Sequence, residues 1–154
     1  MIPVIRFNEF FLELKAEVNE TVSKQISNVI CSPTEQHLIK KLKDSNGLIL
    51  AVKMPDSDSN IENSDNFSEA NHCIVFLIEK VDPGQYYDSN ELAHYASIQE
   101  TMRKLKELIL THGLNGNICG EETLSKNFRT EWEYQIYGGF NGLSISFDLK
   151  DFAL

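Results

Sequence analysis

Cysteine is scarce in this sequence, and its three copies fit no familiar site. Cys31, Cys73 and Cys119 are odd in number and lie more than forty residues apart. That spacing suits neither a disulfide framework nor a zinc site, which needs closely spaced pairs of ligands. We therefore expect free thiols and no structural metal.

Long apolar runs are also missing. The longest, Cys73–Ile78, is far too short to cross a bilayer. Arg6, Asn8 and Glu9 interrupt the apolar residues at the N-terminus, so this segment lacks the apolar core of a signal peptide. The expectation is a cytoplasmic protein without a membrane partner.

Positive charge is the third deficit. The 154 residues include 14 lysines and arginines against 23 aspartates and glutamates, which gives a net charge of -9. A field of that sign repels phosphate backbones, so nucleic acid is not an expected partner. The densest cationic stretch, Lys40, Lys41 and Lys43, is typical of a solvated helix face. Length and composition are those of one domain over residues 1–154.

Apolar residues recur at helical spacing in two long segments. The first runs from Asn8 to Ile30 with Asn8 as its N-cap, although β-branched residues leave its C-terminal end open. The second covers residues 88–113, where Asp88 and Glu91 have the spacing of a capping box. A serine followed by a proline predicts a further short helix over residues 33–43.

Four segments have the patterns of strands. Residues 48–54 and 72–81 are apolar at successive positions, as in strands covered on both faces. Residues 131–136 and 143–149 alternate around a glycine-rich turn and predict a hairpin with one polar face. Residues 55–71 hold five acidic and no basic residues, and we interpret them as a mobile acidic surface loop.

The order of these elements predicts an α+β fold. We expect a mostly antiparallel sheet of about four strands, with two to three helices packed on one face. The polar faces of the last two strands would then face solvent.

No local spacing predicts a catalytic residue, a cofactor site or a metal site. Asp56, Asp58 and Asn60 match the start of a calcium loop, but Ile61 and Phe67 stand where its glycine and final glutamate are needed. The remaining polar and glycine candidates are typical of surface or structural positions. They are His37, His72, His94 and His112, the glycines Gly116, Gly120, Gly138, Gly139 and Gly142, and the pairs Glu121 with Glu122 and Glu131 with Glu133.

Four aromatic residues fall in or beside turns, namely Tyr86, Tyr87, Tyr137 and Phe140. Exposed aromatic side chains are enriched at protein interfaces, so we predict these four as candidate interface residues. The alternative is that they close the ends of the core. The hairpin could also pair its edge with another subunit.

The helix pattern of residues 88–113 and the hairpin of residues 129–149, which includes IYGGFNGLSISFDL, resemble small phage and prophage assembly proteins. These are the tail-terminator and head-to-tail connector proteins. The resemblance covers about a third of the chain and gives no residue a role. It implies helices on one face of an antiparallel sheet and assembly into rings.

The leading hypothesis is therefore a non-enzymatic interaction or assembly subunit that associates with copies of itself or with another protein. One alternative is a small enzyme or ligand-binding domain whose site is built from distant residues, around Trp132, His72 and Glu122. Another is a regulatory protein that masks a basic partner with its negative charge.

Overall fold

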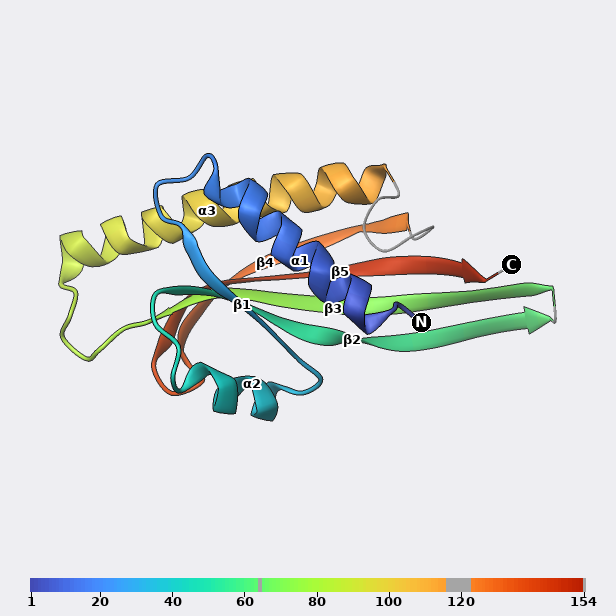
Figure 1. Ribbon diagram of the computed structural model, residues 1–154, viewed down its shortest axis with the longest axis horizontal. Coiled ribbons are helices and arrows are strands. Elements are labelled where there is room, and N and C mark those ends of the chain that lie inside the picture. The colour runs from blue at the N-terminus through green and yellow to red at the C-terminus, as the bar shows by residue number, and fades with distance from the viewer. Residues whose placement is uncertain (64, 116–122, 154) are drawn as a thin grey trace.

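The computed structural model describes residues 1–63, 65–115 and 123–153 (Figure 1). Within them, three helices and five strands follow one another along the chain. They are α1 (Val4–Asn19), β1 (Ile26–Ser32), α2 (Glu35–Leu42), β2 (Leu48–Asn63), β3 (Asn66–Lys80), α3 (Asp88–Leu114), β4 (Thr123–Ile136) and β5 (Phe140–Ala153).

The strands form one mixed sheet in the order β1-β2-β3-β5-β4. Only the β1–β2 pair is parallel, and the other three pairs are antiparallel. The α+β class and the mostly antiparallel sheet are confirmed, with β3 at the centre as its apolar sequence predicts. The described strands number five rather than about four, because β1 lies where the sequence pattern predicts the end of the first helix.

Helices cover both faces of the sheet, so the prediction that they pack on one face is wrong. α1 and α3 contribute to a core that includes Leu48, Leu50 and Val75. α2 lies on the other side (Figure 1), where its buried Leu38 and Leu42 join a second core. The physical reason lies in β2 and β3. Both strands have consecutive apolar residues, at 48–52 and 73–78, so both of their faces must be covered.

The first helix is shorter than predicted at its C-terminal end and longer at its start. α1 begins at Val4 with Pro3 at the N-cap and ends at Asn19, so Asn8 is not its cap. Ile26 and Ile30 lie instead in β1. Their spacing of four suits one face of a helix, but a register shift between Ile26 and Asn28 in β1 places Ile26 in the first core and Ile30 in the second.

The two later helices lie close to their predicted positions. Thr34 caps α2, and its hydroxyl accepts a hydrogen bond from the His37 N–H at 3.2 Å, whereas Ser32 is the last residue of β1. α3 spans Asp88–Leu114, and its N-cap, Tyr87, makes no side-chain capping bond. Among the described residues no helix is long and apolar enough to cross a membrane.

The interpretation of residues 55–71 as a loop is wrong. β2 and β3 continue as a long hairpin, paired from Leu48 with Glu79 out to Asn63 with Asn66. β5 pairs with β3 along the same length, so the backbone of this polar segment is bonded on both sides of β3. The polar composition indicates that the side chains are exposed, and most of them are. Exposed side chains do not prevent a strand from forming its backbone hydrogen bonds with neighbouring strands. Figure 1 shows the hairpin projecting past the helices.

The closing hairpin of β4 and β5 is confirmed. Its turn contains Gly138 and Gly139, whose φ values of 85° and 112° favour glycine. Gly142 pairs with Ile78 where β5 runs beside β3. A Cβ at this position would be 2.1 Å from the Leu77 carbonyl oxygen, which leaves no room for a side chain. These glycines therefore shape and pack a hairpin, as the sequence pattern predicts.

Candidate functional site

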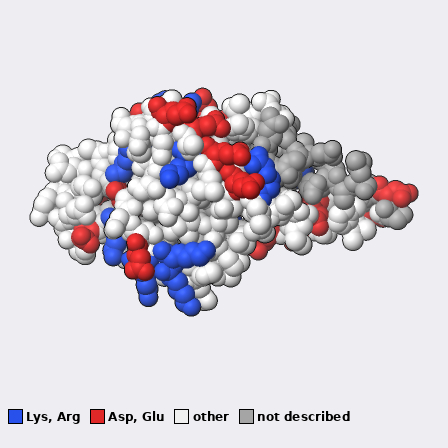
Figure 2. Space-filling view, in the orientation of Figure 1, with Lys and Arg blue, Asp and Glu red and all other residues white. Residues whose placement is uncertain are grey.

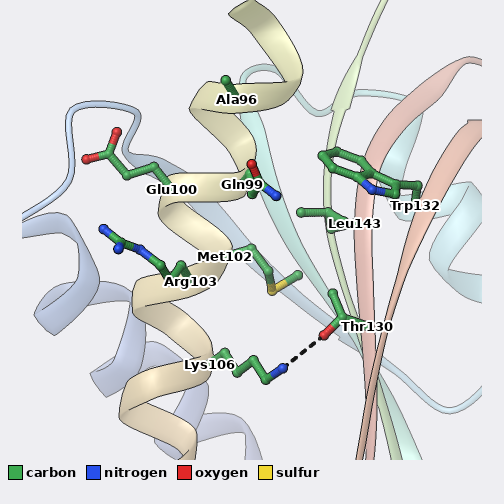
Figure 3. A pocket seen from close by; sticks show the side chains of 9 residues that line it. All are labelled: Ala96, Gln99, Glu100, Met102, Arg103, Lys106, Thr130, Trp132 and Leu143. Carbon is green, nitrogen blue, oxygen red and sulfur yellow. Dashed lines mark hydrogen bonds between the residues drawn. The ribbon is translucent and has the colours of Figure 1, made fainter. Parts of the chain in front are cut away.

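Apolar surface is open to solvent between α3 and the edge strand β4. A groove with a volume of about 530 Å³ runs between them (Figure 3). Ala96, Gln99, Met102 and Lys106 line it from α3, and Thr130, Trp132 and Leu143 line it from the sheet. Met102 and Leu143 are buried, but the Trp132 side chain above them is 53% exposed. We call this the α3–β4 groove.

Trp132 belongs to a group of aromatic side chains that continues along β4. Its ring meets Tyr95 of α3 edge to face at a centroid distance of 5.5 Å. Tyr95 in turn donates a hydrogen bond to Glu91 at 3.2 Å, and burial together with this bond raises the pKa of its hydroxyl. Tyr134, two residues beyond Trp132, is 69% exposed. An indole and a phenol thus stand open to solvent on one face of an edge strand.

Phe128 extends the same face toward the start of β4. Its ring stacks on Phe147 at 5.2 Å, and the Lys106 ammonium lies 5.0 Å from its centroid. Lys106 also donates to the Thr130 hydroxyl at 3.3 Å, as the dashed line in Figure 3 marks. Beside the groove, the Phe128 ring therefore lies next to the cation of Lys106. We call the outer side of β4 from Phe128 to Tyr134 the β4 edge.

Two of the predicted interface residues, Tyr86 and Tyr87, precede α3. Tyr87 is 75% exposed, as the prediction requires. Tyr86 is partly covered, because its ring stacks on buried His94 at 4.4 Å. Burial lowers the pKa of His94, whose Nε2 has no hydrogen-bond partner among the described residues. His94 therefore packs under Tyr86, with its Nδ1 3.5 Å from Glu79 Oε2.

The other two, Tyr137 and Phe140, belong to the second core. Phe140 is buried, so its predicted exposure is wrong. Tyr137 packs edge to face on Phe76 at 5.3 Å, and burial, reinforced by Glu35, raises the pKa of its hydroxyl. These two residues close the end of the core, which is the alternative that the sequence leaves open. The structure does not bring the four aromatic residues together.

His72 lies between two carboxylates on the outer part of the hairpin. Its Nδ1 is 2.6 Å from Asp148 Oδ1, and its Nε2 is 2.9 Å from Asp58 Oδ2. Hydrogen bonds to Asp58 and Asp148 raise the pKa of the imidazole. Both nitrogens face acceptors, so the protonated ring fits this site best. Of the residues that match the start of a calcium loop, Asp58 thus faces His72 on the neighbouring strand, and Asp56 pairs with Lys53 of its own strand.

The remaining chemical candidates are either in local pairs or outside the described residues. Within the described residues, no group of three or more His, Cys, Asp and Glu could hold a metal ion. Glu131 is paired with Arg129 at 2.6 Å, and Glu133 accepts from the Ser144 hydroxyl at 2.6 Å. Cys119, with Gly116 and Gly120 around it, and the pair Glu121 and Glu122 lie outside the described residues.

The structure places two of the three residues of the alternative site, Trp132 and His72, on opposite faces of the sheet. Trp132 is opposite Leu143 on the face that α1 and α3 cover. His72 alternates with Cys73, which belongs to that same core, so its side chain lies on the other face. Glu122 is among the residues that the structure does not describe.

Charge is unevenly distributed over the surface. Figure 2 shows acidic side chains along α1 and a group of basic side chains over α2, where the sequence has Lys40 and Lys41. Lys41 donates to the Cys31 carbonyl at 2.8 Å, so part of this basic group supports β1. The predicted solvated helix face is consistent with this placement.

No protein-family model matches the chain, and no curated protein is significantly similar to it. The sequence patterns did not predict the α3–β4 groove. The signal available was the alternation of Trp132 and Tyr134 with Glu131 and Glu133. The alternation indicates a strand with two unlike faces, but only the strand order shows that β4 is an edge.

Proposed function

We propose that this protein is a non-enzymatic assembly subunit that binds other protein chains, copies of itself included, through the β4 edge. One observation carries the proposal: two large aromatic side chains, Trp132 and Tyr134, stand more than half exposed on an edge strand. Tryptophan and tyrosine dominate the binding energy of protein interfaces, and an unpaired strand edge offers backbone hydrogen bonds to a partner. Both features occur on the same seven-residue stretch, Phe128–Tyr134.

The lining of the α3–β4 groove supports a binding role over a catalytic one. Trp132, Met102 and Leu143 offer apolar surface, which suits packing against another chain. The one carboxylate that lines the groove, Glu100, lies on the side of α3 turned away from Trp132 (Figure 3). Lys106 is already bonded to Thr130. The resemblance to phage and prophage tail-terminator and connector proteins agrees with an assembly role and makes that the biological setting we favour.

Light scattering coupled to size exclusion, across a concentration series, tests the proposal. We expect a discrete oligomer whose mass is a whole multiple of 17.6 kDa. Trp132 is the sole tryptophan, so its emission reports on the β4 edge directly and should shift to shorter wavelength as the oligomer forms. A monomer at every concentration, with an unchanged emission spectrum, would count against self-association and leave assembly without support.

A second candidate is a small-molecule binding domain, because the groove volume of about 530 Å³ falls within the usual range for ligand sites. An indole with a nearby ammonium, Trp132 with Lys106, would favour an aromatic carboxylate. Titration of monomer with such compounds, followed by Trp132 emission, tests this hypothesis. Saturable quenching that Lys106→Met abolishes would favour ligand binding over assembly.

A further inference from the structure

The two edges of the sheet differ in how their backbone is protected. On β1, the Asn19 side-chain amide binds both the N–H and the C=O of Ile26, at 2.7 and 2.9 Å. Asn28 accepts from the Val29 N–H, and Lys41 donates to the Cys31 C=O. Side chains that occupy an edge in this way keep another strand from pairing with it. β1 is therefore a closed edge.

β4 has no such protection along its middle. From Phe128 to Tyr134, within the described part of the strand, no side chain bonds to the backbone of β4. β5 pairs with one side of the strand, so the alternate N–H and C=O groups on the other side face solvent. A closed edge and an open edge on one sheet point to β4 as the side that accepts a partner strand.

The sequence of the β4 edge is complementary to itself when reversed. Consider two copies of β4 paired antiparallel with Thr130 opposite Thr130. Each residue then lies opposite the residue of the other copy whose number, added to its own, gives 260, and the two side chains share one face. Arg129 then faces Glu131 of the second copy, and Glu131 faces its Arg129. Phe128 faces Trp132, again twice. The centre is a Thr–Thr pair, which is among the favourable cross-strand pairs.

Neighbouring registers lose this match. A pair centred on Glu131 sets Arg129 against Glu133 but places Glu131 against its own copy, and a pair centred on Trp132 sets Glu131 against Glu133 twice. Like charges directly opposite one another destabilise a strand pair. Charge complementarity thus selects one register, and it requires a second copy of this chain because the match arises from reversing the same segment.

We propose that two copies of this protein join β4 to β4, antiparallel, with Thr130 facing Thr130 across a twofold axis. This rests on the proposed assembly function and names its partner and register. On one face, Arg129 and Glu131 of the two copies form a ring of four alternating charges, which builds on the existing Arg129–Glu131 pair at 2.6 Å. On the other face, Trp132 of each copy packs on Phe128 of the other, next to the α3–β4 groove. The two Lys106 side chains also approach the axis, where solvent and salt screen their repulsion.

Charge variants test the pairing through mixing. Arg129→Glu gives a β4 edge with only acidic residues at positions 129 and 131, and Glu131→Arg gives one with only basic residues. Each alone should raise the dimer dissociation constant about tenfold or more, because two attractive pairs become repulsive. An equimolar mixture should form a heterodimer at about the wild-type concentration, since every opposite pair is restored between chains. The charge pair within each chain stays broken in the mixture, so recovery reports contacts between copies.

A cysteine placed on the axis tests the register. Thr130→Cys should form a disulfide dimer under mild oxidation, because directly opposite Cα atoms lie about 4.5 to 5.5 Å apart in an antiparallel pair. Trp132→Cys is the matched control: it occupies the same face, but its own copy lies four positions away in this register. Wild type gives the background from the native thiols. Failure of Thr130→Cys to exceed both controls would overturn the register.

The outcomes separate this inference from the proposed function. An even number of copies, heterodimer recovery and a disulfide at position 130 together support the β4 pairing. If wild type forms an oligomer but the variants neither dissociate it nor recover on mixing, the β4 pairing is wrong and assembly stands. If wild type is a monomer throughout, the β4 pairing is wrong, and the proposed function loses its self-association.

Discussion

β1 and β4 lie at opposite edges of one sheet and differ in what covers them. α1 packs over one face of β1 and α2 over the other, which buries Ile26 in the first core and Ile30 in the second. α3 packs against one face of β4, and Trp132 stays more than half exposed. Burial of apolar surface is the main driving force of folding, so the β1 side holds more of the folding free energy. The β4 side retains apolar surface whose burial can drive association.

The largest expected effect comes from truncating the side chains that cover the β1 side. Leu38 of α2 is fully buried, and Leu38→Ala should lower the free energy of unfolding by about 2 to 5 kcal/mol through lost burial and a cavity. Leu92→Ala removes the same atoms from the exposed face of α3 and should change it by less than about 0.5 kcal/mol. Urea unfolding of both variants measures the difference. Equal losses would remove the contrast between the two sides.

Removal of the side chain that caps β1 should have the next largest effect. Asn19→Ala leaves the N–H and C=O of Ile26 without their partner and should cost about 1 to 3 kcal/mol of unfolding free energy. Asn19→Asp keeps the acceptor for the N–H but places a carboxylate oxygen, which cannot donate, against the Ile26 C=O, so it should recover only part of the loss. The same urea experiment ranks the two variants. If the alanine variant is as stable as wild type, water replaces the two hydrogen bonds of Asn19 with no loss of unfolding free energy.

Local sequence signals predict the covered part of the fold well. Cys73–Ile78 is apolar at every position, which requires cover on both faces and a central strand, and β3 has both. The glycine pair at 138 and 139 predicts the turn, because positive φ is costly for other residues. Asp88 and Glu91 lie in the first turn of α3. In each case neighbours along the chain carry the information.

What the sequence could not predict depends on contacts between distant segments. Polar residues 55–63 form a strand only because residues 66–72 pair with them, and β5 supports that pairing from the other side. His72 meets Asp148 across 76 positions of sequence. The exposure of Trp132 follows from β4 being an edge, and the strand order that decides this is not encoded in the period-two pattern of β4 itself.

A smaller effect on the folded monomer, but a clear one on association, is expected at Trp132. Trp132→Ala removes a half-exposed ring and should change unfolding free energy by less than about 1 kcal/mol. Association should weaken about tenfold or more if the indole is an interface anchor. Tyr87→Ala is the control, because Tyr87 is also exposed but lies outside β4. Light scattering of dilution series compares them, and equal weakening by both variants would place the contact elsewhere.

The smallest expected effect concerns His72, on the open hairpin rather than under a helix. Its pKa is raised above the ordinary value of 6.5 by hydrogen bonds to Asp58 and Asp148, so the folded state binds the imidazole proton more tightly than the unfolded chain does. The stabilisation is fully present below the unfolded pKa of about 6.5 and is lost as pH rises through the folded pKa. Because the ring is 48% exposed, we expect at most about 1 kcal/mol.

Unfolding of wild type and His72→Gln at two pH values, one below about 6 and one near 9, measures this contribution of His72 to stability. The stability difference between the two proteins should be larger at the lower pH. Asp148→Asn should lower the His72 pKa, as read from the imidazole proton shifts by NMR, because it removes one of the two acceptor carboxylates. A stability difference that grows with pH would contradict the sign of the effect. It would mean that the neutral ring, rather than the cation, is what the hairpin holds between its two aspartates.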